Sequence, residues 1–166
     1  MRVALAEAAR ARAEGNIGVG SLVVRDGVVI GRGRNTVNSS RDITAHAETV
    51  TLRDLSLAMG APIPPYLSGP GLLTGHVLYT TVEPCPMCAF ACCIAGVSTI
   101  VIGARFARMG VRTHGDYTIE KLLELTGHRV EIVSGILHDE CAALRSPGTR
   151  WAATCSPFRA DGPGRW

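Results

Sequence analysis

The stretch HVLYTTVEPCPMCAFACCIAGVSTIVIGA, residues 76–104, contains the pattern that decides the fold. It begins with a strand-like run over 76–82, and a helix is expected to start at Cys85 and to end near Ala95. The run 97–104 is almost entirely apolar and β-branched, which is typical of a central strand buried on both faces. A strand, a helix and a strand in this order predict a parallel pair joined by a right-handed crossover.

The segments on either side extend this unit to a larger sheet. Residues 20–33 predict a hairpin, because Asp26-Gly27 is the strongest two-residue turn signal between two apolar strands. The whole pattern predicts an α/β fold, a three-layer α/β/α sandwich around a mixed five-stranded sheet. The other expected elements are helices over 2–14, 44–60 (capped by Thr44), 118–127 (capped by Thr118) and 135–145, a polar loop over 35–42, and a strand over 128–133.

Length and composition indicate one globular domain. The chain has 166 residues, of which 46% are hydrophobic and 19% charged. We expect the domain to occupy residues 1–146, with a connector rich in Pro and Gly at 61–75 and a tail containing Pro, Gly and Trp at 147–166. No apolar run is long enough to span a membrane, and residues 1–15 lack the apolar region of a signal peptide. We therefore expect a cytoplasmic protein with no membrane partner.

The charge of the chain favours a small substrate over a nucleic acid. The net charge is +3, and all but one of the 17 basic residues are arginine, Lys121 being the exception. These residues are scattered, and their densest cluster lies at 104–112. A nucleic-acid-binding protein more often has a continuous basic stripe, so tRNA is the less favoured partner.

Four of the six cysteines lie at 85–93, where Cys85 and Cys88 form a C-x-x-C motif. Such a motif at a helix start is compatible with a redox pair or with half of a metal site. A reducing cytoplasm disfavours a disulfide, and Cys92-Cys93 has the wrong spacing to complete a structural zinc knuckle. The motif alone leaves the redox and metal alternatives open.

The segment His46-Ala47-Glu48 favours the metal alternative. It lies near the start of another expected helix, and one imidazole with two thiolates is a ligand set of catalytic zinc sites. We therefore expect His46, Cys85 and Cys88 to bind one Zn²⁺ ion, with water as the fourth ligand. Glu48 is the expected catalytic residue, because a carboxylate beside the metal can pass protons from water to the substrate.

The order His46-x-Glu48…Pro84-Cys85-x-x-Cys88 is the signature of zinc deaminases. The chain resembles the cytidine deaminase superfamily over about residues 1–146. It is most similar to the branch that contains bacterial tRNA adenosine deaminase, guanine deaminase and fungal-type cytosine deaminase. The resemblance rests on the segments GRGRN, DITAHAE, LYTTVEPCPMC, VIGAR and HRVEIVSGILHDECAAL.

This resemblance implies the five-stranded fold, the zinc site and a homodimer or larger assembly. It also implies that Asn35, eleven residues before His46, hydrogen-bonds the bound base. Two departures concern the substrate. The loop at 105–117 differs from the pattern of tRNA-editing relatives, and the tail at 147–166 stands in place of a basic C-terminal helix.

We therefore expect a zinc-dependent hydrolytic deaminase of a free nucleobase or related heterocycle, such as guanine, cytosine, isoguanine or an aminotriazine. The alternative is a tRNA-specific adenosine deaminase that converts the wobble adenosine to inosine, which the N-terminal half and residues 128–144 favour. A third hypothesis, a redox or structural-zinc protein, uses only the C-x-x-C motif. Besides Asn35, the residues expected to contact substrate are Phe106, Glu83, His114, Asp116 and Trp151.

Overall fold

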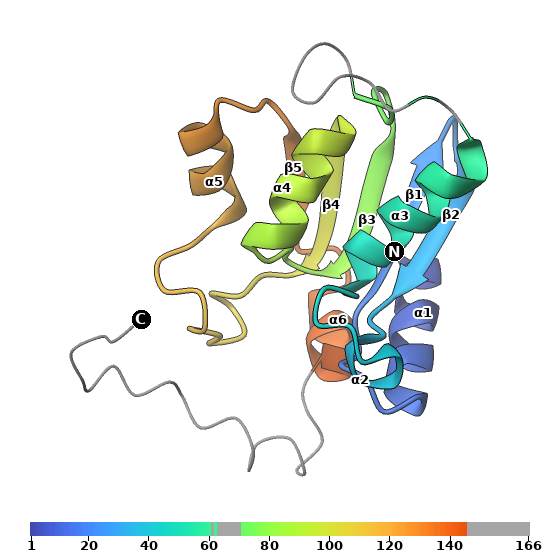
Figure 1. The fold of residues 1–166 in the computed structure, drawn as a ribbon. Coiled ribbons are helices and arrows are strands. Elements are labelled where there is room, and N and C mark those ends of the chain that lie inside the picture. The colour runs from blue at the N-terminus through green and yellow to red at the C-terminus, as the bar shows by residue number, and fades with distance from the viewer. Residues whose placement is uncertain (61, 63–70, 146–166) are drawn as a thin grey trace, which may run out of the picture.

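A mixed five-stranded sheet forms the centre of the protein, as predicted (Figure 1). The computed structural model describes residues 1–60, 62 and 71–145. The strands are β1 (Gly20–Arg25), β2 (Val28–Arg34), β3 (Val77–Val82), β4 (Thr99–Ala104) and β5 (Glu131–Ser134). Their order is β2-β1-β3-β4-β5, in which β1 is antiparallel to both neighbours and β3, β4 and β5 are parallel.

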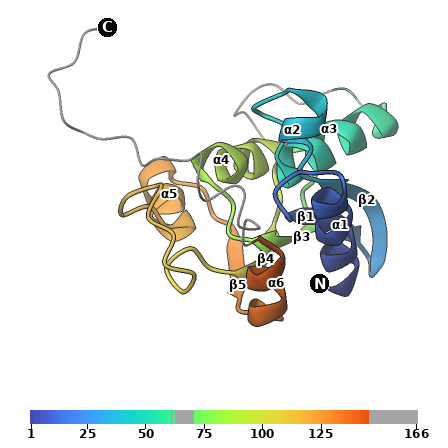
Figure 2. The same ribbon diagram turned by 90° about the horizontal axis from the view of Figure 1, so that it is seen from below.

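Helices cover both faces of this sheet, which gives the expected three layers (Figure 2). The helices are α1 (Arg2–Ala13), α2 (Val37–Ser40), α3 (Ala47–Met59), α4 (Pro86–Ala95), α5 (Ile119–Thr126) and α6 (His138–Arg145). α3, α4 and α5 lie on one face, and α1 packs against α6 on the other. α4 and α5 are the crossovers that connect the parallel strands, as the alternation of strand and helix requires.

The hairpin and the central strand agree with the sequence prediction. Asp26 and Gly27 have φ angles of 49° and 76°, the left-handed pair that a two-residue type I′ turn needs. Ile100 and Ile102 on β4 are fully buried in the core with residues of α4 and α5, and α6 packs against this strand from the other face. Burial of each such side chain stabilises the fold by about 1.5–3 kcal/mol.

The helix that carries His46 starts later than predicted. Thr44 does not cap it, because the amide and the hydroxyl of Thr44 both donate to Asp42 Oδ1, at 2.8 and 2.7 Å. These bonds close a turn, and α3 begins at Ala47 with His46 at the N-cap. This later start places His46 at the N-terminal end of α3.

Other element boundaries also differ from the prediction. The short helix α2 lies in the predicted loop, because Asn16 Oδ1 accepts from the amides of Asn38 and Ser39, at 2.9 and 3.1 Å. β5 and α6 each begin three residues later than expected. For α6 the reason is local, since Gly135 and Leu137 have φ angles of 88° and 56°, which no helix accommodates.

Some sequence predictions lie outside the described residues. They concern the tail at 147–166, including Trp151, and most of the connector at 61–75. Within the described ranges, no helix is long and apolar enough to cross a membrane.

Candidate metal centre and adjoining pocket

Two helix N-termini converge on the predicted metal site. His46 and Cys85 are the N-cap residues of α3 and α4, and both have extended backbone angles. Cys88 lies in the first turn of α4 and is buried. Pro86 follows Cys85 directly, and proline is favoured at this first helical position. The positive ends of both helix dipoles therefore stabilise negative charge on the thiolates.

The three side chains have the separations of a tetrahedral zinc site. The Sγ atoms of Cys85 and Cys88 each lie 3.6 Å from His46 Nδ1. All candidate ligand atoms of the three residues lie within 4.8 Å of one another. Zn–S and Zn–N bonds of about 2.3 and 2.0–2.1 Å at tetrahedral angles place sulfur and nitrogen about 3.6 Å apart. The donor set and its geometry therefore fit a Zn²⁺ ion.

The charge of the cluster is concentrated on Cys85. A hydrogen bond between the two thiols lowers the pKa of Cys85 to about 4 and raises the pKa of Cys88. His46 then faces a thiolate, and its hydrogen bond with Cys85 raises the pKa of the imidazole. Zinc coordination requires both thiols deprotonated and the imidazole neutral, so binding releases protons.

Glu48 lies beside the cluster, in the first turn of α3. Its side chain is only 3% exposed, and this burial raises the pKa of its carboxyl group. Thr80 on β3 donates to Glu48 Oε1 at 2.7 Å, which holds the carboxylate in one orientation. Gly33 on β2 allows the close approach behind it, because a Cβ there would overlap Thr51 and the carbonyl of Ala47.

A pocket of about 170 Å³ opens onto these residues. Asn35, at the end of β2, lines it together with His46, Glu48 and Cys85. Asn35 is buried, and its Oδ1 accepts from the amide of Val37 at 3.3 Å, while its NH₂ group forms no hydrogen bond with the described residues. The structure thus brings a polar, buried amide side chain to the same cavity as the metal ligands and the buried carboxylate.

Glu83 holds the loop that forms one wall of this pocket. Its carboxylate accepts from the amides of Phe106 and Ile119, at 2.9 and 3.2 Å, and lies 3.4 Å from Arg105 Nε. Glu83 is buried, and Arg105 in turn pairs with Glu120 on α5. The partners of the Glu83 carboxylate therefore belong to the protein itself, although the residue lines the pocket.

The other predicted contact residues have different positions. Phe106 and His114 both line the pocket, and their rings lie 5.0 Å apart between centroids. Asp116 is exposed and does not line the pocket, and its backbone carbonyl accepts from Lys121 Nζ at 2.8 Å. Trp151 lies outside the described residues.

Cys92 and Cys93 lie on the same helix as the metal cluster but pack into the core. Cys141 on α6 is buried in the smaller cluster beside α1. Thr80 and Arg145 are among the residues near the cavity that sequence reasoning missed. Arg145 has no sequence signal, because its approach to the pocket depends on how α6 packs.

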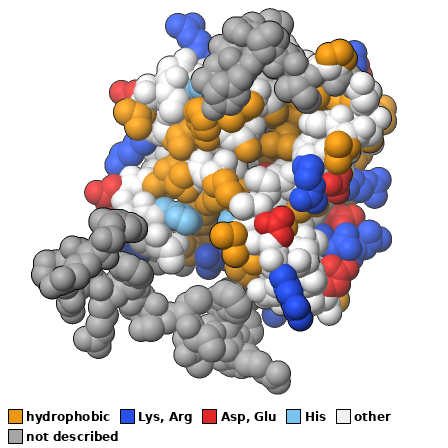
Figure 3. Space-filling view, in the orientation of Figure 1, with side chains coloured by type: hydrophobic (Ala, Val, Ile, Leu, Met, Phe, Trp, Pro, Cys, Tyr) orange, Lys and Arg blue, Asp and Glu red, His pale blue; other side chains and the backbone are white. Residues whose placement is uncertain are grey.

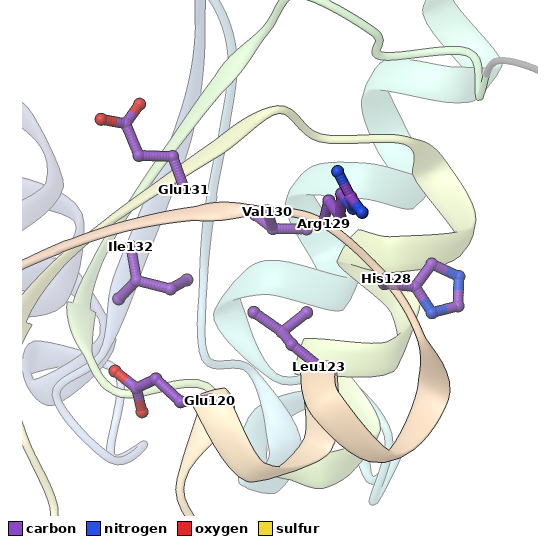
Figure 4. Close-up of a pocket in the computed structure, with 7 residues that line it drawn as sticks. All are labelled: Glu120, Leu123, His128, Arg129, Val130, Glu131 and Ile132. Carbon is purple, nitrogen blue, oxygen red and sulfur yellow. The ribbon is translucent and has the colours of Figure 1, made fainter.

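A second hollow, of about 610 Å³, lies between α5 and the edge strand β5 (Figure 4). It is lined by charged and apolar side chains, and none of the residues predicted for the site is among them. The chemistry suggested by the sequence therefore gathers at the smaller pocket. The lining residues of the second hollow are Glu120, Leu123, His128, Arg129, Val130, Glu131 and Ile132.

Comparison with known sequences agrees with this geometry. Residues 1–104 match the family model described as the cytidine and deoxycytidylate deaminase zinc-binding region. The chain is 33% identical, over 148 residues, to the tRNA-specific adenosine deaminase of Bacillus subtilis (strain 168). The aligned region covers 88% of this chain and 84% of that protein.

Solved structures of deaminases are also similar to this chain. A structure from a study of A-to-I editing by tRNA:A34 deaminases at the wobble position of transfer RNA is 31% identical, with a TM-score of 0.71. The match covers 87% of this chain and 96% of that chain. The guanine deaminase of Bacillus subtilis is also 31% identical, but its TM-score is 0.57 and the match covers 72% of this chain and 71% of that one.

Proposed function

The chain belongs to the family of the cytidine and deoxycytidylate deaminase zinc-binding region, and from this premise we propose that it converts an adenosine of tRNA to inosine. Membership makes it a zinc-binding hydrolytic deaminase. The observation that carries the finer proposal is the similarity to a tRNA-specific adenosine deaminase across 84% of that protein's length. The proposed reaction consumes adenosine and water and releases ammonia.

The expectation that the substrate is a free nucleobase is wrong. The similarity to tRNA-specific adenosine deaminases, in sequence and in fold, extends over most of the chain and overturns it. Three features supported that expectation: the altered loop at 105–117, the scarcity of lysine, and the tail at 147–166 in place of a basic C-terminal helix. The scarcity of lysine does not exclude RNA, since arginine binds phosphate at least as well as lysine does.

We assign the zinc ion to His46, Cys85 and Cys88, because their donor atoms have tetrahedral spacing. When bound there, zinc supplies a water molecule whose pKa is lowered to about 7. The amide hydrogen atoms of the two helix N-termini and the thiolates set the charge around that position.

Glu48 is the proposed proton carrier. It accepts one proton from the attacking water and delivers it to the ring nitrogen. It then takes the second proton from the hydroxyl group formed on the ring carbon and delivers it to the leaving amine, which departs as ammonia. Burial keeps the pKa of the carboxyl group above its ordinary value, so the carboxylate takes up a proton more readily here than it would in bulk water. Thr80 orients the carboxylate for both transfers.

Asn35 and Phe106 are the proposed contacts of the base. The buried amide of Asn35 offers hydrogen bonds to a ring edge, and the ring of Phe106 offers a face for stacking. His114 lies against Phe106 and closes the same wall. A flipped-out adenine would be held by these groups with its amino-bearing carbon toward Glu48.

Glu83→Gln is expected to weaken both stability and activity without loss of zinc. A glutamine has one acceptor oxygen, so one of the amides of Phe106 and Ile119 would face an NH₂ group. The free energy of unfolding should fall by about 1–3 kcal/mol. Glu120→Gln is the control, since Glu120 also pairs with Arg105 but lies at the surface. Equal stability and activity of the two variants would contradict this role.

The substrate is tested with purified protein, an anticodon stem-loop RNA with adenosine at the wobble position, and a panel of free bases. Inosine in the digested RNA, measured by mass spectrometry, is the expected result, with no ammonia released from guanine or cytosine. A matched stem-loop with the adenosine outside the wobble position is the control. Ammonia release from a free base without any inosine in the RNA would overturn the proposal.

We also propose that the protein is a homodimer and acts in the cytoplasm. α4 contains no charged residue, and Met87 and Ile94 on it are each 39% exposed. Figure 3 shows hydrophobic side chains gathered over this helix. An apolar helix of this kind is normally covered on all sides. The cysteines in the described ranges are all free, which suits a reducing compartment.

Ile94→Asp is therefore expected to convert the dimer to a monomer, because a carboxylate cannot be buried unpaired between two helices. Size-exclusion chromatography with light scattering measures the mass. The control is Leu125→Asp, a change at an 87% exposed apolar residue on α5. A wild-type protein with the mass of one chain would contradict the proposal.

A further inference from the structure

Among the described residues, Arg145 is the only arginine that lines the candidate active-site pocket. It is the last residue of α6, a helix on the opposite face of the sheet from α3 and α4 (Figure 2). Its neighbours in the lining include Ile17 and Val19, from the segment between α1 and β1. A cation from the opposite layer therefore lines the same cavity as Asn35 and Glu48.

The end of α6 is tightly placed. Arg12 on α1 donates to the carbonyl of Ala143 at 3.2 Å. A Cβ on Gly18 would overlap the carbonyl of Leu144, so the chain before β1 lies directly on the last turn of α6. These contacts hold the backbone of Arg145 beside the pocket.

The charge of Arg145 has no counterpart in the described part of the protein. No carboxylate in residues 1–60, 62 or 71–145 forms an ion pair with it. The two carboxylates of the pocket are otherwise engaged, Glu48 with Thr80 and Glu83 with backbone amides. Arg145 is half-buried, and this burial lowers the pKa of its guanidinium.

A simpler role for Arg145 is to stabilise the C-terminal end of the α6 dipole, which an exposed arginine would do equally well. Its half-burial at the pocket indicates a further role for the guanidinium, because a charge taken out of water without a partner costs free energy. An anion that arrives with the substrate removes this cost. The guanidinium fork matches a phosphate through two parallel hydrogen bonds.

We infer that Arg145 binds a backbone phosphodiester next to the adenosine that enters the pocket. The inference rests on the proposed function and specifies how RNA is held there. A cavity of about 170 Å³ takes a base, while the sugar-phosphate chain of a flipped-out nucleotide stays at the rim. Arg145 lines this cavity from α6, a helix on the face of the sheet opposite α4.

The test measures RNA affinity as a function of salt. Fluorescence anisotropy of a labelled anticodon stem-loop gives the dissociation constant of the full chain, loaded with zinc, at several salt concentrations. Loss of one phosphate contact should reduce the slope of log affinity against log salt by about 0.7. We expect Arg145→Gln to show this reduction and to bind about tenfold more weakly at low salt.

Two further variants distinguish a direct phosphate contact from an effect of net charge or of misfolding. Arg129→Gln removes the same charge from an exposed residue at the second hollow (Figure 4), and its slope should equal that of the wild type. Arg145→Lys keeps a point charge without the fork, and it should keep the slope but lose part of the affinity. Melting temperature and zinc content should be the same in all variants.

Equal slopes for Arg145→Gln and Arg129→Gln would overturn the phosphate contact. Inosine formation by the wild type is recorded in the same samples and tests the proposed function separately. A reduced slope in Arg145→Gln without inosine in the wild type would overturn the proposed reaction and leave the phosphate contact standing. Failure of the wild type to bind the RNA would overturn both.

Discussion

Replacement of Glu48 with glutamine is expected to lower the rate of inosine formation by about 10²–10⁴-fold while zinc remains bound. Glutamine has the same shape and can still accept from Thr80, so the packing around α3 should persist. It cannot take a proton from water or return one to the leaving amine. The measurement is a single-turnover rate on stem-loop RNA, with the zinc content of the same sample.

The control for this variant is Glu7→Gln. Glu7 is also a buried glutamate, but it pairs with Arg10 and Arg34 outside the pocket. This change should lower stability and leave the rate per folded molecule unchanged. If Glu48→Gln retained the wild-type rate, the site would not use a carboxylate for proton transfer. The hypothesis of a redox or structural-zinc protein, which needs only the C-x-x-C motif, would then regain support.

Cys88→Ser is expected to remove zinc and to reduce activity to the background. Its Sγ atom lies 3.6 Å from His46 Nδ1, and a serine hydroxyl in its place is a poor ligand for zinc. Because metal binding contributes to folding free energy, the melting temperature should fall as well. Zinc is measured by atomic emission on dialysed protein, and activity by inosine formation.

Cys92→Ser is the matched control, four residues further along the same helix. Cys92 is fully buried in the core and is not among the residues whose donor atoms cluster around His46. Its replacement should keep one zinc per chain and cost about 1–3 kcal/mol of stability, because a hydroxyl is buried there. Loss of zinc in this variant would make Cys92 a ligand and would close the position that water needs.

Local signals predicted most of the fold. The apolar run of β4, the Asp26-Gly27 turn and the glycines that end α3 and α4 act over a few residues, where sequence and conformation are directly coupled. The helix starts were less accurate. Asp42 closes a turn, so α3 begins at a later residue than predicted, and Asn16 caps the short helix α2 from a distant segment.

The metal cluster was predicted for a related reason. Its three residues belong to two short motifs at helix starts, and together one imidazole and two thiolates form a donor set that favours zinc. The substrate was predicted wrongly, because charge distribution, one loop and the tail are weak evidence beside similarity along 88% of the chain.

The sequence by itself therefore determined the strand-helix-strand unit, the mixed sheet and the set of residues around His46 that fits a zinc ion. Only the tertiary structure decided how Glu83 and Arg145 are used. Glu83 binds amides that follow β4 and begin α5, and Arg145 reaches the pocket from the opposite layer. These partners are distant in the chain, and no local pattern specifies them. They meet because the strand order places β3 beside β4 and because α6 packs against α1.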